Sequence, residues 1–429
     1  MEQTYLQGIA TKAKQQKSYR FRNLFGELNE SHLFSCWKFI NKKASVGVDK
    51  VSAEMYEENL IGNIQQLVEQ VKGKRYKARL ILRKYIPKAN SDKLRALGIT
   101  ATADKLLQLG AAKILEAIYE QGFHSCSYGY RPNTGAHKAI KSLSDELMKK
   151  RYHTIVEADI KGYFDNIDHD LLMKMLEKRI DDRAFLNLIR KWLKAGVLDN
   201  GIVTKPISGT PQGGVISPIL ANIYLHHVLD DWFKETVQTH CQGDSYLCRY
   251  ADDFVCAFKD RTDASRYYKA LKKRLKRFKL EVATDKTNIL RFSHRKPKSN
   301  VSFTFLGFEF HWGISRRNGN RQRYPILKRR TSPKKQRASQ ANFKEWLKKY
   351  SCLPKKILFA RLNRKLRGYY QYYGIRGNYK SLKAFVYQIT KTLKKWLNRR
   401  SQRKSYNWTG FRELIKHFGI VKPRIIHAF

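Results

Sequence analysis

Two short apolar runs near the middle of the chain limit the ways in which it can fold. Residues 246–250 (YLCRY) and 254–258 (FVCAF) are rich in aromatic and apolar side chains, and only Ala251, Asp252 and Asp253 separate them. Strand-like runs joined by so few residues are typical of a β-hairpin. The sequence therefore predicts an antiparallel pair of strands with two adjacent carboxylates at the turn.

A third acid, Asp159, has a comparable position. Residues 154–158 form a short apolar-rich run that ends at Asp159, and the apolar residues after Asp170 have helical spacing, which predicts a strand, a turn and a helix. Strand ends and turns are places where a fold can bring carboxylates to one point. Neighbouring carboxylates repel one another unless a cation lies between them, and their oxygen atoms suit Mg²⁺. Two adjacent acids alone are more often a solvated loop tip, so the assignment depends on the surrounding sequence.

The charge of the chain indicates what such a metal site acts on. Its 429 residues include 86 Lys and Arg against 36 Asp and Glu, a formal charge of +50, and 42% hydrophobic residues that can supply a core. This composition excludes an ordinary enzyme of small metabolites and indicates nucleic acid, because cationic side chains that bind phosphates release counterions. Two metal ions roughly 3.5–4 Å apart are the general device for phosphoryl transfer at a nucleotide. A membrane surface, the alternative, fits less well with basic residues spread through the chain.

Basic residues are most frequent in the last third of the chain. Residues 291–429 contain 37 Lys and Arg and three acids, a net charge of +34, which leaves +16 of the total +50 for residues 1–290. This difference predicts a catalytic body and a basic, helical module that binds nucleic acid, joined near 315–323. Apolar spacing and residue type predict helices at 263–278, 340–350, 356–373 and 379–399, and a strand at 301–310.

The cysteines and the N-terminus indicate the environment of the protein. The six cysteines form no CxxC pair and no regular framework, so we expect reduced, mostly buried thiols, and the cysteines offer no zinc site. The N-terminus has no apolar signal region, and no run approaches the roughly 18 apolar residues of a membrane-spanning helix. We therefore expect a protein of the bacterial cytoplasm that associates with nucleic acid and not with a membrane.

The segments around the three acids resemble reverse transcriptases, most closely those encoded by bacterial and organellar group II introns. Residues 250–253 (YADD) match the YxDD box of that family, and residues 157–169 (EADIKGYFDNIDH) match the box that holds its first catalytic Asp. Residues 209–224 (GTPQGGVISPILANIY) resemble the box between them, in the same order and with similar spacing.

Upstream segments carry the same resemblance. Ile86-Pro87-Lys88 and residues 93–99 (KLRALGI) resemble fingers segments of the group II branch, as do residues 127–137 (SYGYRPNTGAH). Within the last of these, relatives commonly have a basic residue where this chain has NTG, so no phosphate contact is assigned there. The resemblance extends over nearly the whole chain, from about residue 20 to residue 425.

The resemblance implies an α+β fold of the right-hand polymerase type, with fingers and a palm that contains an antiparallel sheet, followed by a basic all-helical thumb or X domain. The implied domains are an N-terminal extension at 1–60, the fingers and palm at 61–312 and the thumb at 313–429. In relatives the thumb region binds intron RNA and promotes its splicing. No Cys/His cluster follows Trp408, so we expect no endonuclease domain.

The activity implied by the resemblance is RNA-directed DNA synthesis, in which a primer 3′-hydroxyl is extended with dNTPs on an RNA template. The implied cofactors are two Mg²⁺ ions, with Mn²⁺ as a substitute. The implied partners are template or intron RNA and a DNA primer and target, in the splicing and mobility of a group II intron. The oligomeric state stays open. Two other functions also stay open: an RNA-binding splicing cofactor with vestigial polymerase activity, and a domesticated enzyme of DNA repair or phage defence.

The resemblance also assigns the catalytic acids. Asp159 and Asp252 are expected to bridge the metal ions, with Asp253 as a supporting acid and the carbonyl of Ile160 completing the ligand shell. Asp165, Asp168 and Asp170 follow the strand end and compete with Asp159 for its role. A helix N-cap is the better explanation for Asp168 or Asp170, and we expect a structural role for all three.

Other residues are assigned to the incoming nucleotide. Phe164 corresponds to an aromatic residue that lies under the sugar and excludes a 2′-hydroxyl, although it and Tyr163 would also suit the core. Lys88 and Arg95 correspond to cations that hold the triphosphate, with a plain surface position as the alternative. Gln212 corresponds to a residue that shapes the nucleotide pocket, with an ordinary turn as the alternative.

Two further assignments concern the leaving group and the primer. Lys286 corresponds to a lysine that protonates the leaving pyrophosphate. Phe305, Leu306 and Gly307 correspond to the primer grip, for which a plain core strand is the alternative. The tyrosines at 369–373 (YYQYY) are expected to pack in the thumb, with basic faces beside them that contact phosphates.

Overall fold

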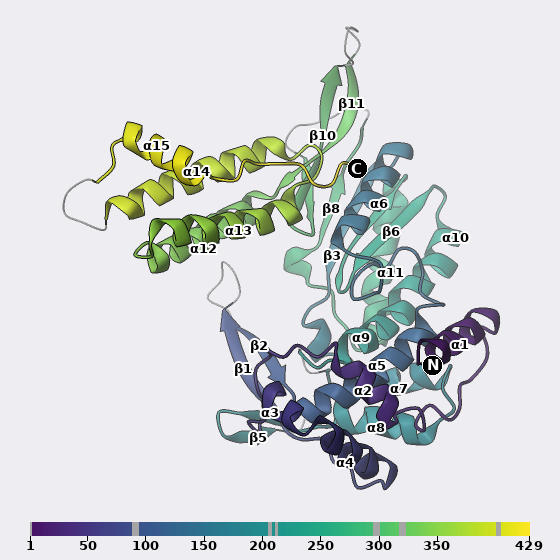
Figure 1. Cartoon of the computed structure of the whole chain (residues 1–429). Helices are drawn as coiled ribbons and strands as arrows, with labels where there is room; N and C mark the ends of the chain where they lie inside the picture. Colours follow the sequence, from purple (N-terminus) through teal and green to yellow (C-terminus); the bar gives the residue numbers. More distant parts are fainter. Residues whose placement is uncertain are drawn as a thin grey trace. The chain divides into compact units, whose positions relative to one another are not determined.

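Figure 1 draws the whole chain, which forms two compact units, each built from two separate segments of the sequence. The first unit is Met1–Ala139 with Ala158–Ile289, and the second is Ile140–Glu157 with Leu290–Phe429. The computed structural model describes residues 2–87, 94–204, 208–210, 213–294, 301–316, 323–399 and 405–429. Within these ranges, no helix has both the length and the apolar content needed to cross a membrane.

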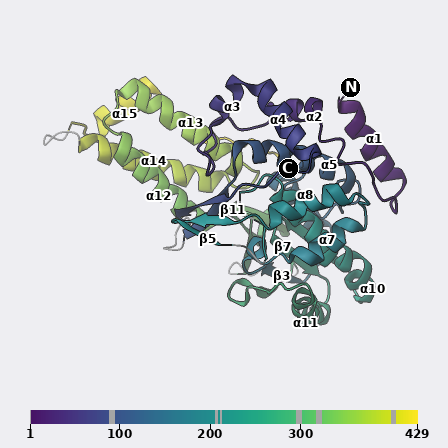
Figure 2. The ribbon, with the colours of Figure 1, turned by 90° about the horizontal axis from the view of Figure 1, so that it is seen from below.

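The first unit begins with helices, two of which pack on one long helix. The helices at its start are α1 (Glu2–Gln15), α2 (Glu30–Trp37), α3 (Ala53–Glu58) and α4 (Leu60–Lys72). Side chains cap two of them, since Asn29 accepts a hydrogen bond from the backbone N–H of His32 at the start of α2, and Ser52 accepts one from Met55 at the start of α3. Both α1 and α2 contact α5 (Thr102–Tyr119), which is therefore central to this part of the unit (Figure 2).

A four-stranded sheet with the order β2-β1-β4-β5 belongs to the first unit. It consists of β1 (Ile81–Pro87), β2 (Leu94–Ile99), β4 (Val197–Asp199) and β5 (Ile202–Thr204). β1 pairs antiparallel with β2 and parallel with β4. β1 and β2 contain the described residues of the two segments near 86–88 and 93–99 that resemble fingers segments. The two segments are thus neighbouring strands of one sheet, in which Arg95 lies opposite Ile86.

A second four-stranded sheet has the order β6-β7-β3-β8. Its strands are β3 (Thr154–Asp159), β6 (Ser245–Tyr250), β7 (Asp253–Phe258) and β8 (Asn288–Arg291). β6 and β7 pair antiparallel up to Tyr250 opposite Asp253, which confirms the predicted hairpin. The strand predicted to end at Asp159 is also confirmed.

Helices complete the first unit, and three of them illustrate how the sequence sets their limits. α7 (His169–Glu177) begins where Asp168 accepts a hydrogen bond from Leu171 N at 2.9 Å, so the predicted N-cap is confirmed. α8 (Arg183–Leu193) packs against α7. α11 (Arg261–Arg277) confirms the helix predicted at 263–278 and contacts β7.

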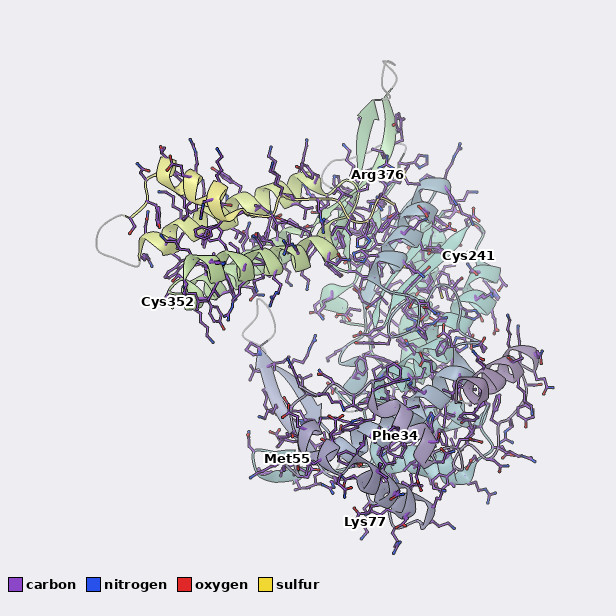
Figure 3. The ribbon with its side chains drawn as sticks, viewed as in Figure 1. Phe34, Met55, Lys77, Cys241, Cys352 and Arg376 are labelled. Carbon is purple, nitrogen blue, oxygen red and sulfur yellow. The ribbon has the colours of Figure 1, made fainter. Side chains whose placement is uncertain are left out.

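Another helix of the first unit changes its winding along its length. It begins as α9 (Ser217–Leu225) and passes through two π-helical segments, η2 (His226–Asp230) and η3 (Phe233–Val237). A last turn, α10 (Gln238–His240), ends it before Cys241, which is labelled in Figure 3. The helix is apolar and buried over α9, where it contacts α5 and α7.

The second unit contains a three-stranded sheet with the order β11-β10-β9. Its strands are β9 (Ser302–Phe305), β10 (Phe308–Arg316) and β11 (Arg323–Thr331). The prediction of one strand over 301–310 is wrong, because the chain reverses at Leu306 and Gly307, with φ of 50° and 81°. Positive φ at both central residues is the conformation of a tight hairpin turn, and it places Phe305 opposite Phe308.

Four helices follow β11 in the described part of the second unit and lie side by side (Figure 1). They are α12 (Pro333–Tyr350), α13 (Lys355–Tyr373), α14 (Tyr379–Asn398) and α15 (Trp408–Phe418). Their apolar faces share one core, and Tyr369 and Tyr370 belong to it, as predicted for packing residues. The helices predicted at 356–373 and 379–399 are confirmed within one residue, whereas α12 begins earlier than 340, at a polar first turn capped by Ser332.

The second unit also includes most of α6 (Ala136–Lys149), which precedes β3 in the chain. Arg329 of β11 donates a hydrogen bond from Nη1 to Ser144 Oγ at 3.2 Å, and Leu327 N donates one to Met148 Sδ at 3.2 Å. The two units are defined by contacts within the chain, whereas the three domains predicted from the sequence are defined by their functional roles. The three domains therefore stay a prediction.

A fully buried ion pair lies inside the first unit. Arg249 of β6 is 0% exposed and Asp230 of η2 is 1% exposed. Nε and Nη2 of Arg249 donate to the two carboxylate oxygens of Asp230 at 2.7 and 2.5 Å. The third nitrogen, Nη1, donates to Asn222 Oδ1 at 3.1 Å and to Ala251 O at 3.0 Å. The guanidinium therefore connects α9, η2 and the β6–β7 turn.

Replacing Asp230 with Asn tests how far the first unit depends on this pair. Asp230→Asn leaves a buried guanidinium without its countercharge, and we expect the free energy of unfolding to fall by about 3–5 kcal/mol, measured by urea denaturation. The matched control is Glu281→Gln, which breaks the exposed pair of Lys161 and Glu281. It should change the free energy by less than about 1 kcal/mol. Equal effects of the two substitutions would contradict the role of the buried pair.

Candidate active site

The turn between β6 and β7 holds two of the three predicted catalytic acids. Ala251 and Asp252 form the connection, and Asp253 is the first residue of β7. Ala251 has a φ of 56°, a left-handed conformation that costs a residue other than glycine about 1 kcal/mol or more. Because Arg249 donates a hydrogen bond to the carbonyl of Ala251, the buried ion pair fixes the backbone next to Asp252.

A glycine of a neighbouring segment packs directly on this turn. Tyr128 N donates a hydrogen bond to Arg249 O at 2.9 Å, which brings Gly129 beside the backbone of Ala251. A Cβ atom on Gly129 would overlap the backbone nitrogen of Ala251, so only glycine fits. Asn222 Nδ2 donates to Gly129 O at 2.7 Å and holds the segment in place.

Asp159 and Ile160 lie where β3 ends. Ile160 forms an antiparallel bridge with Val282, and backbone hydrogen bonds join the residues on either side of this pair. In such a pair the two residues themselves point their N–H and C=O groups away from each other. The carbonyl of Ile160 therefore points away from Val282.

Lys286 pairs with the first acid. It ends the short helix η4 (Thr284–Lys286), and its Nζ lies 2.5 Å from Asp159 Oδ2. This hydrogen bond is the main reason that the pKa of Lys286 is raised above its ordinary value. The lysine side chain is 62% exposed, so its ammonium group is charged and reachable from solvent.

The electrostatics of Asp252 favour a bound cation. Burial raises the pKa of Asp252, and the charge of Asp159 raises it further, while Arg95 and Lys286 act in the opposite direction. Two carboxylates that repel each other in a partly buried place fit a divalent cation with oxygen ligands. Among the described residues, Asp159, Asp252, Asp253 and the carbonyl of Ile160 are those that could hold it.

Two of the residues assigned to the nucleotide, Lys88 and Gln212, lie outside the described residues. Arg95 is an exposed residue of β2. Its charge acts on both Asp252 and Tyr130, so the guanidinium lies within electrostatic range of the acids. The structure thus places Arg95 near the candidate metal site, and its contact with phosphate stays a prediction.

Phe164 and Tyr163 occupy different environments in the short helix η1 (Tyr163–Asp165). Tyr163 is buried and donates a hydrogen bond to Ala221 O at 2.6 Å, so packing accounts for it. Phe164 is half-buried, and its ring meets that of Tyr130 edge to face, with centroids 6.5 Å apart. Phe164 therefore keeps part of its surface exposed while it contacts Tyr130.

The three competing acids after β3 are accounted for without a metal. Asp168 caps α7 and pairs with Lys279 at 2.6 Å. Asp165 and Asp170 are exposed, and Asp170 lies 3.9 Å from Arg190. These positions agree with the structural role expected for them.

The residues assigned to the primer grip belong to the second unit. Phe305 is fully buried at the end of β9, and Leu306 and Gly307 form the turn before β10. Tyr372 donates a hydrogen bond to Leu306 O at 2.8 Å, and Ser332 N donates one to Gly307 O at 3.0 Å. The turn is firmly held against α12 and α13, and its role toward a primer stays a prediction.

Sequence reasoning did not identify the residues that support the turn. Arg249, Asp230, Asn222 and Gly129 come from separate segments and meet only in the fold. One signal was present, because a charged residue inside the apolar run at 246–250 needs a buried partner. The partner itself could not be named from spacing.

The close approach of Gly129 to the turn can be tested by adding one methyl group. Gly129→Ala forces a shift against the backbone of Ala251, and we expect it to lower the free energy of unfolding by about 1–3 kcal/mol, seen as a lower thermal midpoint. Gly135→Ala is the control, because a Cβ at Gly135 meets no atom within 4 Å. If the two variants unfold at the same temperature, the packing described for Gly129 is incorrect.

Comparison with known proteins agrees with this geometry. The family model for reverse transcriptase (RNA-dependent DNA polymerase) matches residues 86–310, which include all three predicted catalytic acids. Group II intron-encoded protein LtrA of Lactococcus lactis subsp. cremoris is 30% identical over 432 residues, which cover 81% of this chain and 69% of that protein. Protein YkfC of Escherichia coli (strain K12) is 35% identical over 294 residues, 61% of this chain and 74% of that protein.

A plant relative extends the comparison. Nuclear intron maturase 1, mitochondrial, of Arabidopsis thaliana is 31% identical over 91 residues, 21% of this chain and 12% of that protein. The α+β architecture, the acids at the strand ends and the basic helical region that follows are those expected from the resemblance found in the sequence. The chain therefore belongs to the reverse transcriptases and maturases encoded by group II introns, and it is an RNA-directed DNA polymerase.

Proposed function

We propose that the enzyme extends the 3′-hydroxyl of a primer with dNTPs on an RNA template, using two Mg²⁺ ions at Asp159 and Asp252. The observation that carries the proposal is the position of Asp252 in the β6–β7 turn, where burial and the charge of Asp159 both raise its pKa. Carboxylates in this arrangement are stabilised by a hard divalent cation, and Mn²⁺ would serve as a substitute for Mg²⁺.

Each acid has a distinct part in this proposal. Asp159 and Asp252 would hold both ions, with Asp253 and the carbonyl of Ile160 as further ligands. The ions would supply Lewis-acid chemistry for attack by the 3′-hydroxyl and for departure of pyrophosphate. Lys286, whose pKa is raised by its hydrogen bond to Asp159, stays protonated and can give a proton to the leaving group.

The nucleotide is held by residues of the fingers and by η1. Arg95 binds the triphosphate through its guanidinium, which matches the geometry of phosphate oxygens, and Lys88 adds a second charge. Gln212 shapes the pocket around the base and sugar. Phe164 presents its accessible face to the sugar, where a 2′-hydroxyl would clash with the ring.

The basic C-terminal region binds nucleic acid in this proposal. Residues 291–429 carry a net +34, and the tyrosines of α13 that form the core leave the charged side chains on the outside. This region binds template or intron RNA and promotes splicing, while Phe305, Leu306 and Gly307 position the DNA primer. The domains follow the sequence division at 1–60, 61–312 and 313–429, and the protein acts in the bacterial cytoplasm.

The other two functions considered from the sequence are not favoured. A splicing cofactor with vestigial polymerase activity has no need of Asp159, Asp252 and Asp253, and all three are present. A domesticated enzyme of DNA repair or phage defence has no specific structural observation in its favour.

Primer extension tests the proposal directly. We expect the wild-type protein to make cDNA from an RNA template with dNTPs and Mg²⁺, and Asp252→Asn to reduce the rate at least about 100-fold, because the isosteric change removes a ligand charge. Asp170→Asn is the matched control, since Asp170 is exposed and lies outside the metal site, and it should retain the wild-type rate. A wild-type protein that binds RNA but makes no cDNA would exclude the proposed reaction.

Asp252→Asn, which should lower the rate of primer extension, should raise the stability of the metal-free protein. The folded protein holds a proton on Asp252 at higher pH than the unfolded chain does, so the ionised form opposes folding and stability without Mg²⁺ decreases as pH rises through that range. At pH 7 and without Mg²⁺, Asp252→Asn should therefore have a higher thermal midpoint than the wild type. Adding Mg²⁺ should raise the midpoint of the wild type more than that of the variant.

Discrimination between sugars tests the role of Phe164. Phe164→Ala removes the ring that would meet a 2′-hydroxyl, and we expect the ratio of kcat/KM for rNTPs to that for dNTPs to rise by roughly tenfold or more. Phe34→Ala is the control, because Phe34 lies on α2 with 53% of its surface exposed (Figure 3). An unchanged ratio in Phe164→Ala, with dNTP incorporation intact, would assign Phe164 to packing alone.

A further inference from the structure

Three histidines surround one carboxylate in the first unit, and none of them takes part in the site described above. His124 Nε2 lies 2.8 Å from Asp231 Oδ1, and His226 Nε2 lies 3.5 Å from the same oxygen. His227 Nδ1 lies 3.1 Å from the other oxygen, Oδ2. One ligand atom from each of His124, His226 and Asp231 can be chosen so that all three lie within 4.8 Å of one another.

We propose that these three residues bind a transition-metal ion of the Zn²⁺ type. Imidazole nitrogen and carboxylate oxygen are ordinary ligands of zinc. Two histidines and one aspartate supply three ligands and leave the fourth position of a tetrahedral zinc ion open. Around a tetrahedral zinc with bonds of about 2.0–2.1 Å, neighbouring ligand atoms are about 3.3 Å apart. The separations of 2.8 and 3.5 Å are close to this spacing.

The environment of His226 distinguishes a metal site from a simple hydrogen-bonded cluster. Hydrogen bonds alone would satisfy Asp231, which accepts one from His124 and one from His227. They leave His226, which is 8% exposed, without a good partner: its Nδ1 has none among the described residues, and its Nε2 is 3.5 Å from the carboxylate. An ion bound to Nε2 would give this buried ring a closer partner than the carboxylate oxygen at 3.5 Å.

The π-helical segment η2 brings two of the ligands onto one face. In a regular α-helix, residues five apart point roughly 140° away from each other. Here the backbone N–H of Asp231 bonds to the carbonyl of His226, five residues earlier, so the wider turn places the two side chains one above the other. Such local π turns occur frequently at functional sites.

The surroundings resemble those of other metal sites. His227 donates its hydrogen bond to the oxygen of Asp231 that the ion would not need, and metal-binding carboxylates are commonly oriented by such an outer partner. Phe123 packs its ring edge to face with His226, with centroids 5.2 Å apart, and provides an apolar wall. Mg²⁺ prefers oxygen ligands, so this ion would differ from the catalytic ones.

The position of the site gives the ion a structural role. It would join the segment after α5, through His124, to the helix that carries η2. The residue before Asp231 is Asp230, the partner of Arg249. Metal binding would therefore stabilise the helix next to the buried ion pair, and with it the β6–β7 turn.

The test measures zinc bound to the full-length protein prepared without a histidine tag. The protein is dialysed against Zn²⁺ with excess Mg²⁺ present, and bound zinc is counted by plasma emission spectrometry. We expect one zinc per chain and a raised thermal midpoint. A wild-type protein that retains no zinc overturns the proposal.

Variants locate the bound ion. His124→Gln and Asp231→Asn should each abolish stoichiometric binding, and His227→Gln should weaken it by about 10–100-fold, as expected for an outer partner. His240→Gln is the matched control, because His240 is an exposed histidine at the end of the same helix, and it should bind zinc as the wild type does. Retention of zinc in both His124→Gln and Asp231→Asn places the ion elsewhere and overturns the proposal.

A second measurement does not depend on the variants being folded. Co²⁺ is added to the wild-type protein as a substitute for zinc, and its visible absorption spectrum is recorded. Strong bands of four-coordinate Co²⁺, lost on addition of zinc, support the site. Only the weak bands of six-coordinate Co²⁺ overturn it.

Discussion

The buried pair of Arg249 and Asp230 is the interaction on which the geometry of the active site depends. A guanidinium with no exposed surface must find its hydrogen-bond acceptors inside the protein, and here they are a carboxylate, an amide and the carbonyl of Ala251. The last contact holds a residue with positive φ directly before Asp252. A strained turn persists only when its surroundings determine it, and here a charged network buried in the fold does so.

In this chain, which has a net charge of +50, basic side chains lie close enough to Asp159 and Asp252 to reduce the repulsion between them. Lys286 neutralises Asp159 in part, and the charge of Arg95 acts on Asp252, so cations of the protein offset some of the repulsion between the two carboxylates. Both of these cationic side chains are exposed. The basic composition that favours binding to a polyanion therefore also makes the acidic cluster tolerable before metal binds.

Local patterns predicted much of this structure. The β6–β7 hairpin, the strand ending at Asp159, the cap at Asp168 and two of the C-terminal helices all depend on residues close together in the sequence. The start of α12 was missed because its first turns are polar, and the turn at Leu306 was missed because no asparagine or aspartate marks it. The partners of Arg249 and the histidines around Asp231 could not be predicted, since His124 and His226 are far apart in the chain and meet only through packing.

The interleaved make-up of the two units has a consequence for how the protein is made. Residues 140–157 belong to the second unit, although most of that unit is encoded after residue 289. On the ribosome, α6 emerges long before β11, which supplies the partners of Ser144 and Met148. During synthesis, residues 140–157 of the second unit therefore lack most of their partners until the first unit has been completed and the residues after 289 have been made. A fragment cut at the sequence boundary near residue 313 would lack that early segment and would expose the side of β11 that it covers.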